Sequence, residues 1–371
     1  LLLLAVCVTL CAVLCSAARP TWRDLETYNF DRFVSDFNRN YDSQEEFAMR
    51  KNLFETRIRD IIQHNKDITK TWKRGINDFS DLTEEEFRVR LGVRRELLYE
   101  SRKHQGHNVL QKETPAHLLK GLPGHVDWRQ KNPSVVTPVK DQGSCGSCWS
   151  FAAAQSIESQ WALATGELHV LSEQNILGCT SNPQQCGGSG GCEGATADLA
   201  FETVVANGLA SEWTYPYISY HGEDYECMFS TKNTPPVANI SSYVVLPVNQ
   251  YSPLLEAVAT KGPIAISVDA GAWGDYETGV FNGCNQTNPV INHGVQLVGY
   301  GTDSGNDYWL VRNSWAPTWG EQGYIRIFRT SQVQCGTDLE PLTGTGCVGG
   351  PPSVTVCGTC GILYATSYPV V

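Results

Sequence analysis

The sequence predicts an α+β protein, in which a helical front segment precedes a larger body with helical and strand-forming parts. Residues 149–164 are good helix formers and apolar nearly all round, with Gly166 as a stop signal, so they predict a buried helix. Residues 293–301 (HGVQLVGYG) and 307–315 (DYWLVRNSW) have the composition of buried strands. A chain of 371 residues is long enough for two or three folded units with a sizeable core.

Charge is distributed unevenly between the front segment and the body. Residues 19–121 carry 20 Lys and Arg against 18 Asp and Glu, whereas residues 122–371 carry 8 against 21. The net charge of −11 argues against a nucleic-acid-binding surface, and a hydrophobic content of 41% is too high for intrinsic disorder. We therefore expect a folded acidic body that attracts a slightly basic front segment.

Residues 1–18 have the features of a secretory signal peptide, because an apolar run is followed by small residues. No Met opens the chain, so we expect the first few residues of the precursor to be missing. An uncleaved signal anchor is the alternative, although the run is marginal for a membrane span of about 20 residues. We expect entry into the secretory pathway, and no stable membrane insertion once the signal is removed.

The front segment contains two helix-like patterns between residues 24 and 91. Six residues of the first recur at steps of three or four and therefore share one helix face: Glu46, Arg50, Phe54, Arg57, Ile61 and Asn65. Four residues at alternate positions follow them: Gly75, Asn77, Phe79 and Asp81. An ordinary amphipathic helix pair would also explain the first pattern. Residues 99–121 are polar and aperiodic, which predicts an exposed linker.

Of the 14 cysteines, 11 remain after the signal peptide. In an exported protein ten of them can form five disulfides, which leaves one free thiol. The pairs Cys145/Cys148 and Cys357/Cys360 have the C-x-x-C spacing of a structural zinc site or a thioredoxin-like redox pair. The oxidising compartment and the long separation of the pairs disfavour zinc, and the surrounding pattern does not suit a redox βαβ unit. We expect no metal and no cofactor.

Cys148 is the candidate for the free thiol, because it opens the predicted helix, where the helix dipole favours a thiolate. A thiolate nucleophile needs a partner that stabilises it and later protonates the leaving amine, and an imidazole can do both. Among the eight histidines, His293 differs in opening a predicted buried strand. Asn313, near the end of the next strand, has a side-chain amide that could orient the imidazole.

Together these residues resemble the papain family of cysteine proteases, and the chain resembles a precursor of the cathepsin L type. The local signature is residues 145–149 (CGSCW), and other family landmarks match residues 171–174, 191–194 and 319–324. The two patterns of the front segment resemble the motifs of the family's inhibitory prodomain, except that Arg57 stands where Asn is usual. The similarity runs from about residue 40 to the C-terminus.

The resemblance implies a papain-like fold in which a cleft separates a helical half, starting at Cys148, from a β-barrel-like half that carries His293 and Asn313. It divides the chain into a signal peptide (1–18), a prodomain (19–121) and a peptidase domain (122–371).

The resemblance also implies catalytic roles. Cys148 would be the nucleophile and His293 its general base and acid. Asn313 would orient His293, and Gln142 would share an oxyanion hole with the Cys148 backbone N–H. Two tryptophans would cover the contact between His293 and Asn313: Trp315 and Trp319.

In this family the pocket for the second residue before the scissile bond sets specificity. The residues implied for that pocket and the neighbouring cleft are Gly194, Thr196, Ala197, Ser267, Ile291, Trp319 and Ala365. None is acidic, so hydrophobic or aromatic residues should be preferred over Arg. No two-histidine occluding loop is recognisable, which favours an endopeptidase over a dipeptide-releasing exopeptidase.

The family's disulfides would be Cys145–Cys192, Cys179–Cys227 and Cys284–Cys360, which leaves Cys148 free. The remaining Cys186, Cys335, Cys347 and Cys357 allow three connectivities. Residues 332–359 look like an insertion, for which a disulfide-stapled surface loop and a binding site are both open. Asn239 and Asn285 begin glycan acceptor sequences.

We therefore expect a monomeric cysteine endopeptidase, made as a zymogen and inhibited by its own prodomain, that cleaves protein and peptide substrates. Its expected location is a lysosome- or vacuole-like compartment or the extracellular space. Acid should promote self-processing, because protonated carboxylates attract the basic prodomain less. The alternatives are a catalytically silent, protease-like binding protein and a transpeptidase or ligase that uses the same thioacyl intermediate.

Overall fold

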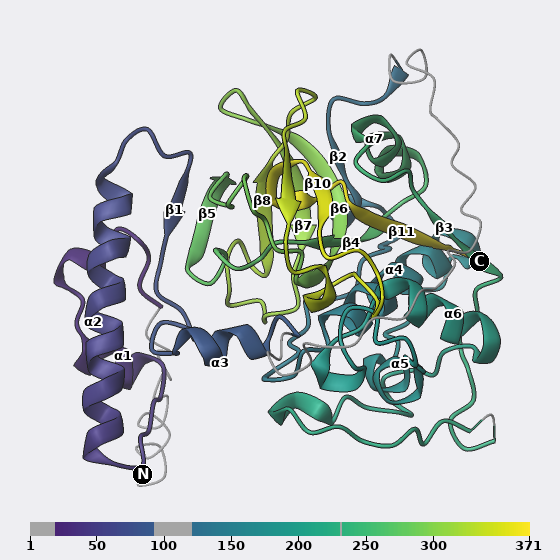
Figure 1. Cartoon of the computed structure of the whole chain (residues 1–371), viewed down its shortest axis with the longest axis horizontal. Coiled ribbons are helices and arrows are strands. Elements are labelled where there is room, and N and C mark those ends of the chain that lie inside the picture. Colours follow the sequence, from purple (N-terminus) through teal and green to yellow (C-terminus); the bar gives the residue numbers. More distant parts are fainter. Residues whose placement is uncertain (1–18, 93–120, 231) are drawn as a thin grey trace, which may run out of the picture.

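The computed structural model describes residues 19–92, 121–230 and 232–371. The predicted signal peptide and residues 99–120 of the predicted linker lie outside these ranges. Within them the expected α+β fold is confirmed, because a helical front segment lies beside a body that combines helices with a large sheet (Figure 1). In these described ranges, no helix is both long and apolar enough to cross a membrane.

The front segment is built around one long helix. Its elements are a 3-10 turn (Leu25–Thr27), α1 (Phe30–Asp36), α2 (Gln44–Lys66), β1 (Trp72–Arg74) and α3 (Glu84–Val89). The Ser43 side chain accepts a hydrogen bond from the backbone N–H of Glu46 and so caps α2. Phe54 and Ile61 of the predicted helix face are buried against α1, so the face expected from the sequence is the one that packs.

Two arginines of that face hold α2 to the segment that follows β1. Arg50 donates to both carboxylate oxygens of Glu86, at 2.5 and 2.7 Å. Arg57 donates to the backbone oxygens of Leu82, at 3.0 Å, and Phe79. These bonds therefore hold the front segment together as a folded segment rather than a loose extension.

The helical half of the body contains α4 (Cys148–Thr165), α5 (Glu173–Cys179) and α6 (Ala197–Asn207). Helix α4 begins one residue before the predicted start and ends at Gly166, whose φ of 82° is the left-handed conformation that glycine tolerates. Most of its side chains are buried, as the uninterrupted apolar sequence predicts. Short 3-10 turns at Trp128–Gln130, Gly191–Glu193 and Ser219–His221 complete this part of the chain.

The other half of the body is a sheet in the order β1-β5-β8-β7-β6-β4-β11-β3, with β2 pairing with β6. Its strands from the body are β2 (Val126–Asp127), β3 (Ser242–Val245), β4 (Ile264–Val268), β5 (Tyr276–Phe281), β6 (His293–Asp303), β7 (Asn306–Arg312), β8 (Tyr324–Phe328) and β11 (Ala365–Val370). Helix α7 (Tyr251–Thr260) packs beside β6. Strand β1 belongs to the front segment, so that segment extends the sheet of the body through an antiparallel pairing with β5.

Two further strands, β9 (Cys335–Asp338) and β10 (Val354–Cys357), form a separate antiparallel hairpin. Between them lies a 3-10 turn (Pro341–Thr343), and another turn (Thr359–Gly361) leads into β11. The hairpin contains most of the predicted insertion.

Candidate active site

The candidate nucleophile is the first residue of α4. Cys148 is 5% exposed and is the free cysteine of the part of the chain described here. Burial raises the pKa of its thiol to about 11, although backbone hydrogen bonds from Gly294 and Trp149 act in the opposite direction. The sequence alone predicts a shift toward thiolate from the helix dipole; in this state, loss of hydration outweighs it.

His293 opens β6 and lies in the same pocket as Cys148. Its Nε2 is 2.8 Å from Oδ1 of Asn313, and this oxygen also accepts the backbone N–H of Ser314. Because the amide oxygen can only accept, Nε2 carries the proton and the neutral ring leaves a lone pair on Nδ1. Nδ1 is buried without a partner among the described residues.

Burial lowers the pKa of His293 to about 4, against the opposing effect of the Asn313 hydrogen bond. Rings enclose the imidazole: Trp315 lies 4.7 Å from it and Trp273 6.2 Å, centroid to centroid. Trp319 stacks against Trp273 and packs edge-on against Trp315, so it supports the two rings that lie next to the imidazole. Trp273 was not predicted from the sequence, because the loop before β5 carries no recognised motif.

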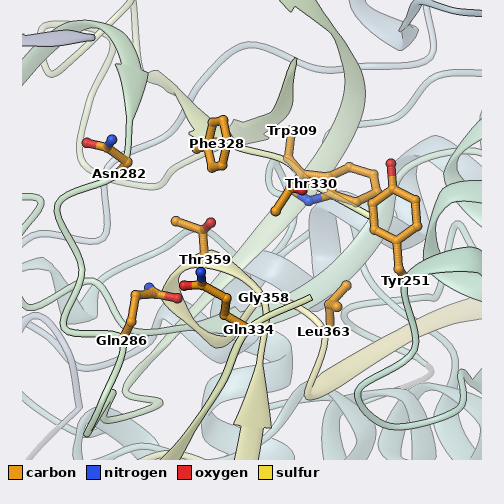
Figure 2. Close-up of a pocket in the computed structure, with 10 residues that line it drawn as sticks. All are labelled: Tyr251, Asn282, Gln286, Trp309, Phe328, Thr330, Gln334, Gly358, Thr359 and Leu363. Carbon is orange, nitrogen blue, oxygen red and sulfur yellow. The ribbon is translucent and has the colours of Figure 1, made fainter. Parts of the chain in front are cut away.

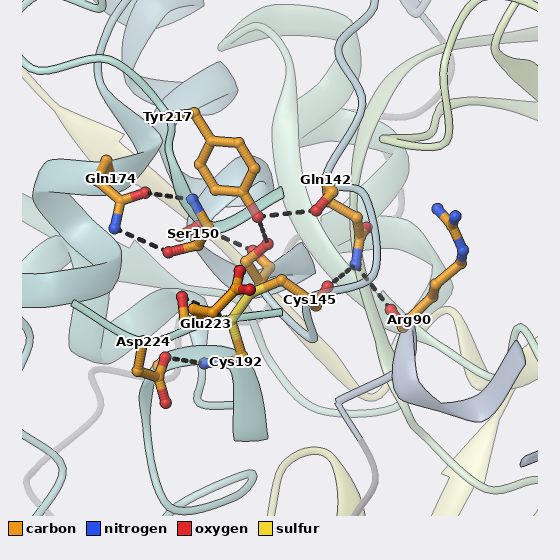
Figure 3. Close-up of a disulfide and its surroundings, with 12 residues drawn as sticks. Arg90, Gln142, Cys145, Ser150, Gln174, Cys192, Tyr217, Glu223 and Asp224 are labelled. Carbon is orange, nitrogen blue, oxygen red and sulfur yellow. Dashed lines mark hydrogen bonds between the residues drawn. A yellow bond between two sulfur atoms is a disulfide. The ribbon is translucent and has the colours of Figure 1, made fainter. Parts of the chain in front are cut away.

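Gln142 lies beside the N-terminus of α4, with its side chain held from both ends. Its Oε1 accepts a 2.6 Å hydrogen bond from the Ser314 hydroxyl, and its Nε2 donates to the backbone oxygen of Cys145 at 2.8 Å. The same Nε2 donates to the backbone oxygen of Arg90 at 2.7 Å (Figure 3). The Gln142 amide, which was predicted to stabilise the oxyanion of a substrate, is therefore hydrogen-bonded to a backbone carbonyl of the front segment in this state.

The front segment covers the site through several contacts. Phe79 and Phe87 pack edge-on against Trp315, at 5.5 and 5.4 Å between ring centroids. Leu91 lines the pocket that contains Cys148. No sequence motif indicates that Arg90 and Leu91 contact the site. They reach it because α3 ends at Val89, next to the site.

A second group of contacts anchors the front segment to β5 and the loop before it. The Arg74 guanidinium forms a salt bridge with Asp275. The side-chain amide of Asn77, from the second predicted pattern, donates to the backbone oxygen of Gly274 at 2.7 Å. The Trp22 backbone N–H donates to Glu277 at 2.8 Å, and burial raises the pKa of this carboxyl to about 7.

The predicted substrate-pocket residues separate into two groups. Gly194, Ala197 and Ser267 line the pocket that holds Cys148 and His293. The remaining four lie outside that lining: Thr196 caps α6, Ile291 is fully buried, Trp319 belongs to the tryptophan cluster and Ala365 pairs with Ser267 across β4 and β11. Thr343 and Gly344 of the insertion also line this pocket, which the sequence analysis did not foresee.

Ten cysteines of the described ranges are joined in five disulfides. Three have the pairing that the family resemblance implies: Cys145–Cys192, Cys179–Cys227 and Cys284–Cys360. The other two select one of the three open connectivities: Cys186–Cys347 and Cys335–Cys357. The Cys145–Cys192 bridge joins the loop before α4 to the Gly191–Glu193 turn, where the backbone N–H of Cys192 donates to the Asp224 carboxylate at 2.7 Å (Figure 3).

Other candidate features lie apart from this site. A hollow beside the C-terminal turn is lined by Tyr251, Asn282, Gln286, Trp309, Phe328, Thr330, Gln334, Gly358, Thr359 and Leu363, none of them a predicted site residue (Figure 2). Asn239 and Asn285, the predicted glycan acceptors, are both exposed. Within the described ranges, no cluster of three or more His, Cys, Asp or Glu residues suits a metal ion.

A helical half and a sheet half that bring together a free cysteine, a His–Asn pair and a glutamine amide define a cysteine peptidase of the papain type. Residues 122–345 match the family model of papain family cysteine proteases, and residues 30–87 match the cathepsin propeptide inhibitor domain. The chain belongs to the papain family of cysteine proteases, and it carries the inhibitor propeptide of that family.

Relatives and solved structures agree with this assignment. The chain is 37% identical to mouse cathepsin S over 83% of its length and 87% of the relative, and 38% identical to mouse procathepsin L over 88% and 95%. Digestive procathepsin L 3 of Tenebrio molitor matches with a TM-score of 0.69 at 32% identity, covering 92% of this chain and 97% of that one. A recombinant stem bromelain precursor matches with a TM-score of 0.72 at the same identity and coverage. The protein is thus a hydrolase in zymogen form, and the front segment is its prodomain.

Proposed function

We propose that this enzyme hydrolyses peptide bonds through a thioester on Cys148, with His293, Asn313 and Gln142 in the roles predicted from the sequence. The observation that carries the proposal is the carbonyl of Arg90, which accepts a hydrogen bond from Gln142. The residue that follows it, Leu91, lines the pocket that contains Cys148. A donor that binds a prodomain carbonyl in the zymogen is suited to bind a substrate carbonyl once the prodomain leaves.

The proposed reaction starts with transfer of the thiol proton to Nδ1 of His293, after which the thiolate Sγ of Cys148 bonds to the substrate carbonyl carbon. The carbonyl oxygen becomes an oxyanion that Gln142 Nε2 and the Cys148 N–H stabilise. The C–N bond then breaks, and the amine leaves with the proton from His293. Water, deprotonated by the same imidazole, attacks the thioester, which releases the acid and restores the thiol.

Departure of the prodomain is what would activate this pair. In the zymogen, burial keeps the thiol protonated and the imidazole neutral at pH 7. Renewed hydration should lower the thiol pKa and raise the imidazole pKa, so that a thiolate–imidazolium pair forms.

We further propose the domain limits 19–121 and 122–371, residence in a lysosome- or vacuole-like compartment or outside the cell, and action on internal bonds of proteins. Gly194, Ala197 and Ser267 support a preference for hydrophobic side chains two residues before the scissile bond, because none of them carries a negative charge that would balance an Arg side chain. Peptides that differ only in Phe or Arg at that position measure this preference.

Labelling with an electrophilic epoxide tests the proposed nucleophile. We expect one adduct on the acid-processed enzyme, mapped by peptide mass spectrometry to Cys148, and much slower labelling of the zymogen, whose thiol is buried and protonated. A processed and folded enzyme that takes no label would favour the catalytically silent binding protein. If the enzyme takes the label and also joins a competing amine to the acyl part of the substrate, the transpeptidase would be favoured.

A glutamate of the prodomain and one of the peptidase domain have pKa values that are shifted in opposite directions. The pKa of Glu86 is lowered to about 2, chiefly by Arg50, so the stability it gives the prodomain is present above about pH 4.5 and lost only as the pH falls toward 2. The pKa of Glu277 is raised to about 7 under the prodomain, against a usual value near 4.5. The bound form thus gains a proton at Glu277, which strengthens prodomain binding as the pH falls from about 7 to about 4.5.

We therefore expect Glu277→Gln to sharpen the proposed acid-promoted processing. The neutral amide removes the cost of a buried charge at about pH 7.5 and changes little at about pH 4.5, so the zymogen should process more slowly at neutral pH only. Processing rates at both pH values, followed on gels, measure the effect. Glu226→Gln, which changes an exposed carboxyl, is the matched control. Equal slowing at both pH values would contradict this assignment.

A further inference from the structure

The insertion that the sequence could not explain forms a strap, which we define as residues 335–357. Strands β9 and β10 are its two arms, with Cys335 opposite Cys357 at the base and Asp338 opposite Val354 at the top. The Cys335–Cys357 disulfide closes the base. Residues 339–353 form the tip, which contains the Pro341–Thr343 turn.

One side of the strap is seated on the sheet half, just before the catalytic histidine. The backbone N–H of Thr337 donates to the Thr287 oxygen at 2.9 Å, and the buried Asp338 carboxylate accepts the backbone N–H of Ile291 at 3.1 Å. A Cβ on Gly344 would lie 1.8 Å from the Ile291 backbone oxygen, so only glycine allows this approach.

The other side of the strap is fastened to the helical half. The Cys186–Cys347 disulfide joins its tip to the loop between α5 and the Gly191–Glu193 turn. Two backbone hydrogen bonds reinforce the bridge: Gly187 N–H to the Gly346 oxygen at 2.8 Å, and Val348 N–H to the Gln184 oxygen at 3.0 Å. The strap therefore connects the two halves that form the cleft.

The point of crossing lies at the pocket that contains Cys148. Gly187, Thr343 and Gly344 line the same pocket as Cys148, Ala197 and Ser267. A Cβ on Gly187 would lie 2.6 Å from the Gly344 oxygen and 3.0 Å from the Ala195 oxygen, so the strap, the loop and the cleft wall meet there without a gap. A peptide that continued past this pocket toward the strap would have to pass the point where the backbones of the strap and of the loop meet.

We propose that the strap closes the acyl side of the cleft at the second residue before the scissile bond. This inference rests on the proposed function, which assigns Ala197 and Ser267 to the pocket for that residue. Because the cleft is closed there, the peptidase prefers to cut the bond after the second residue of a peptide. Internal bonds of longer chains remain substrates, but they are cut more slowly, because the strap must first be displaced.

A length series of peptides tests the proposal on the processed enzyme. The peptides share one scissile bond and carry one, two, three or four residues before it. We expect kcat/KM to rise from one residue to two and to fall by about tenfold for three and four. A profile that stays level or rises beyond two residues in the wild type would overturn the proposal.

Two variants open the strap in different ways. The double substitution C186S/C347S removes the tether, and replacing residues 339–353 by Asn-Gly, together with C186S, closes β9 and β10 through a two-residue turn. Both should raise kcat/KM for the three- and four-residue peptides about tenfold relative to the two-residue peptide cleaved by the same variant. C179S/C227S removes a disulfide elsewhere in the helical half and should leave the length profile as in the wild type.

Titration with the epoxide separates failure of this proposal from failure of the proposed function. If the strap variants take a full equivalent of label but keep the wild-type length profile, the proposal that the strap closes the cleft is overturned and the proposed function stands. Absence of label on the processed wild type would overturn the nucleophile assignment instead.

Discussion

His293→Ala should lower kcat/KM by roughly four orders of magnitude or more, and Cys148→Ser should have an effect of similar size. Without the imidazole, the Cys148 thiol loses both its proton acceptor and the group that protonates the leaving amine. The two residues act as one unit, so the double variant should be little worse than either single variant. Steady-state kinetics on the two-residue peptide measure the loss.

The variants need a fold control, because His293 is buried among tryptophans. Both should still bind separately added prodomain, since Arg74 and Asn77 anchor it away from the thiol. His169→Ala, at a half-buried histidine whose Nε2 lies 3.3 Å from the exposed Glu167 carboxylate, should keep full activity. Retention of more than about a hundredth of the wild-type rate in His293→Ala would show that another group accepts the proton.

Local sequence patterns account for the elements that position the site. Helix α4 follows from an uninterrupted run of apolar helix formers that ends at Gly166, and β6 from the apolar run after His293. The predicted strand over residues 307–315 is too long: β7 ends at Arg312, and the Asn313 N–H bonds to the oxygen of Gly323, the residue just before β8. That early end frees the Asn313 side chain to reach His293.

Features that depend on long-range packing could not be predicted in the same way. Four cysteines allow three connectivities of similar plausibility from sequence, and only the folded loops bring Cys186 to Cys347. Arg90 provides a backbone carbonyl, which no side-chain motif can reveal. The thiol pKa was predicted from helix position alone, whereas burial under Leu91 and the neighbouring walls decides its direction.

Gln142→Ala should lower kcat by a factor of a hundred to a thousand, equivalent to about 3 kcal/mol, with KM little changed. Ser314 and the Cys145 backbone hold the amide in place before substrate arrives, so its Nε2 needs no reorganisation when the oxyanion forms. Such a preorganised donor acts mainly in the transition state, which is why the loss should appear in kcat.

The same substitution should weaken prodomain binding by only about fivefold, because the Arg90 carbonyl would lose one neutral hydrogen bond worth about 1 kcal/mol. Single-turnover kinetics and prodomain inhibition constants measure the two effects on one protein. Ser314→Ala keeps the amide but removes its 2.6 Å anchor, so it should give a smaller loss in kcat than Gln142→Ala. If the loss appeared in KM with kcat unchanged, Gln142 would bind the ground-state carbonyl, and the oxyanion would have to rely on the Cys148 N–H alone.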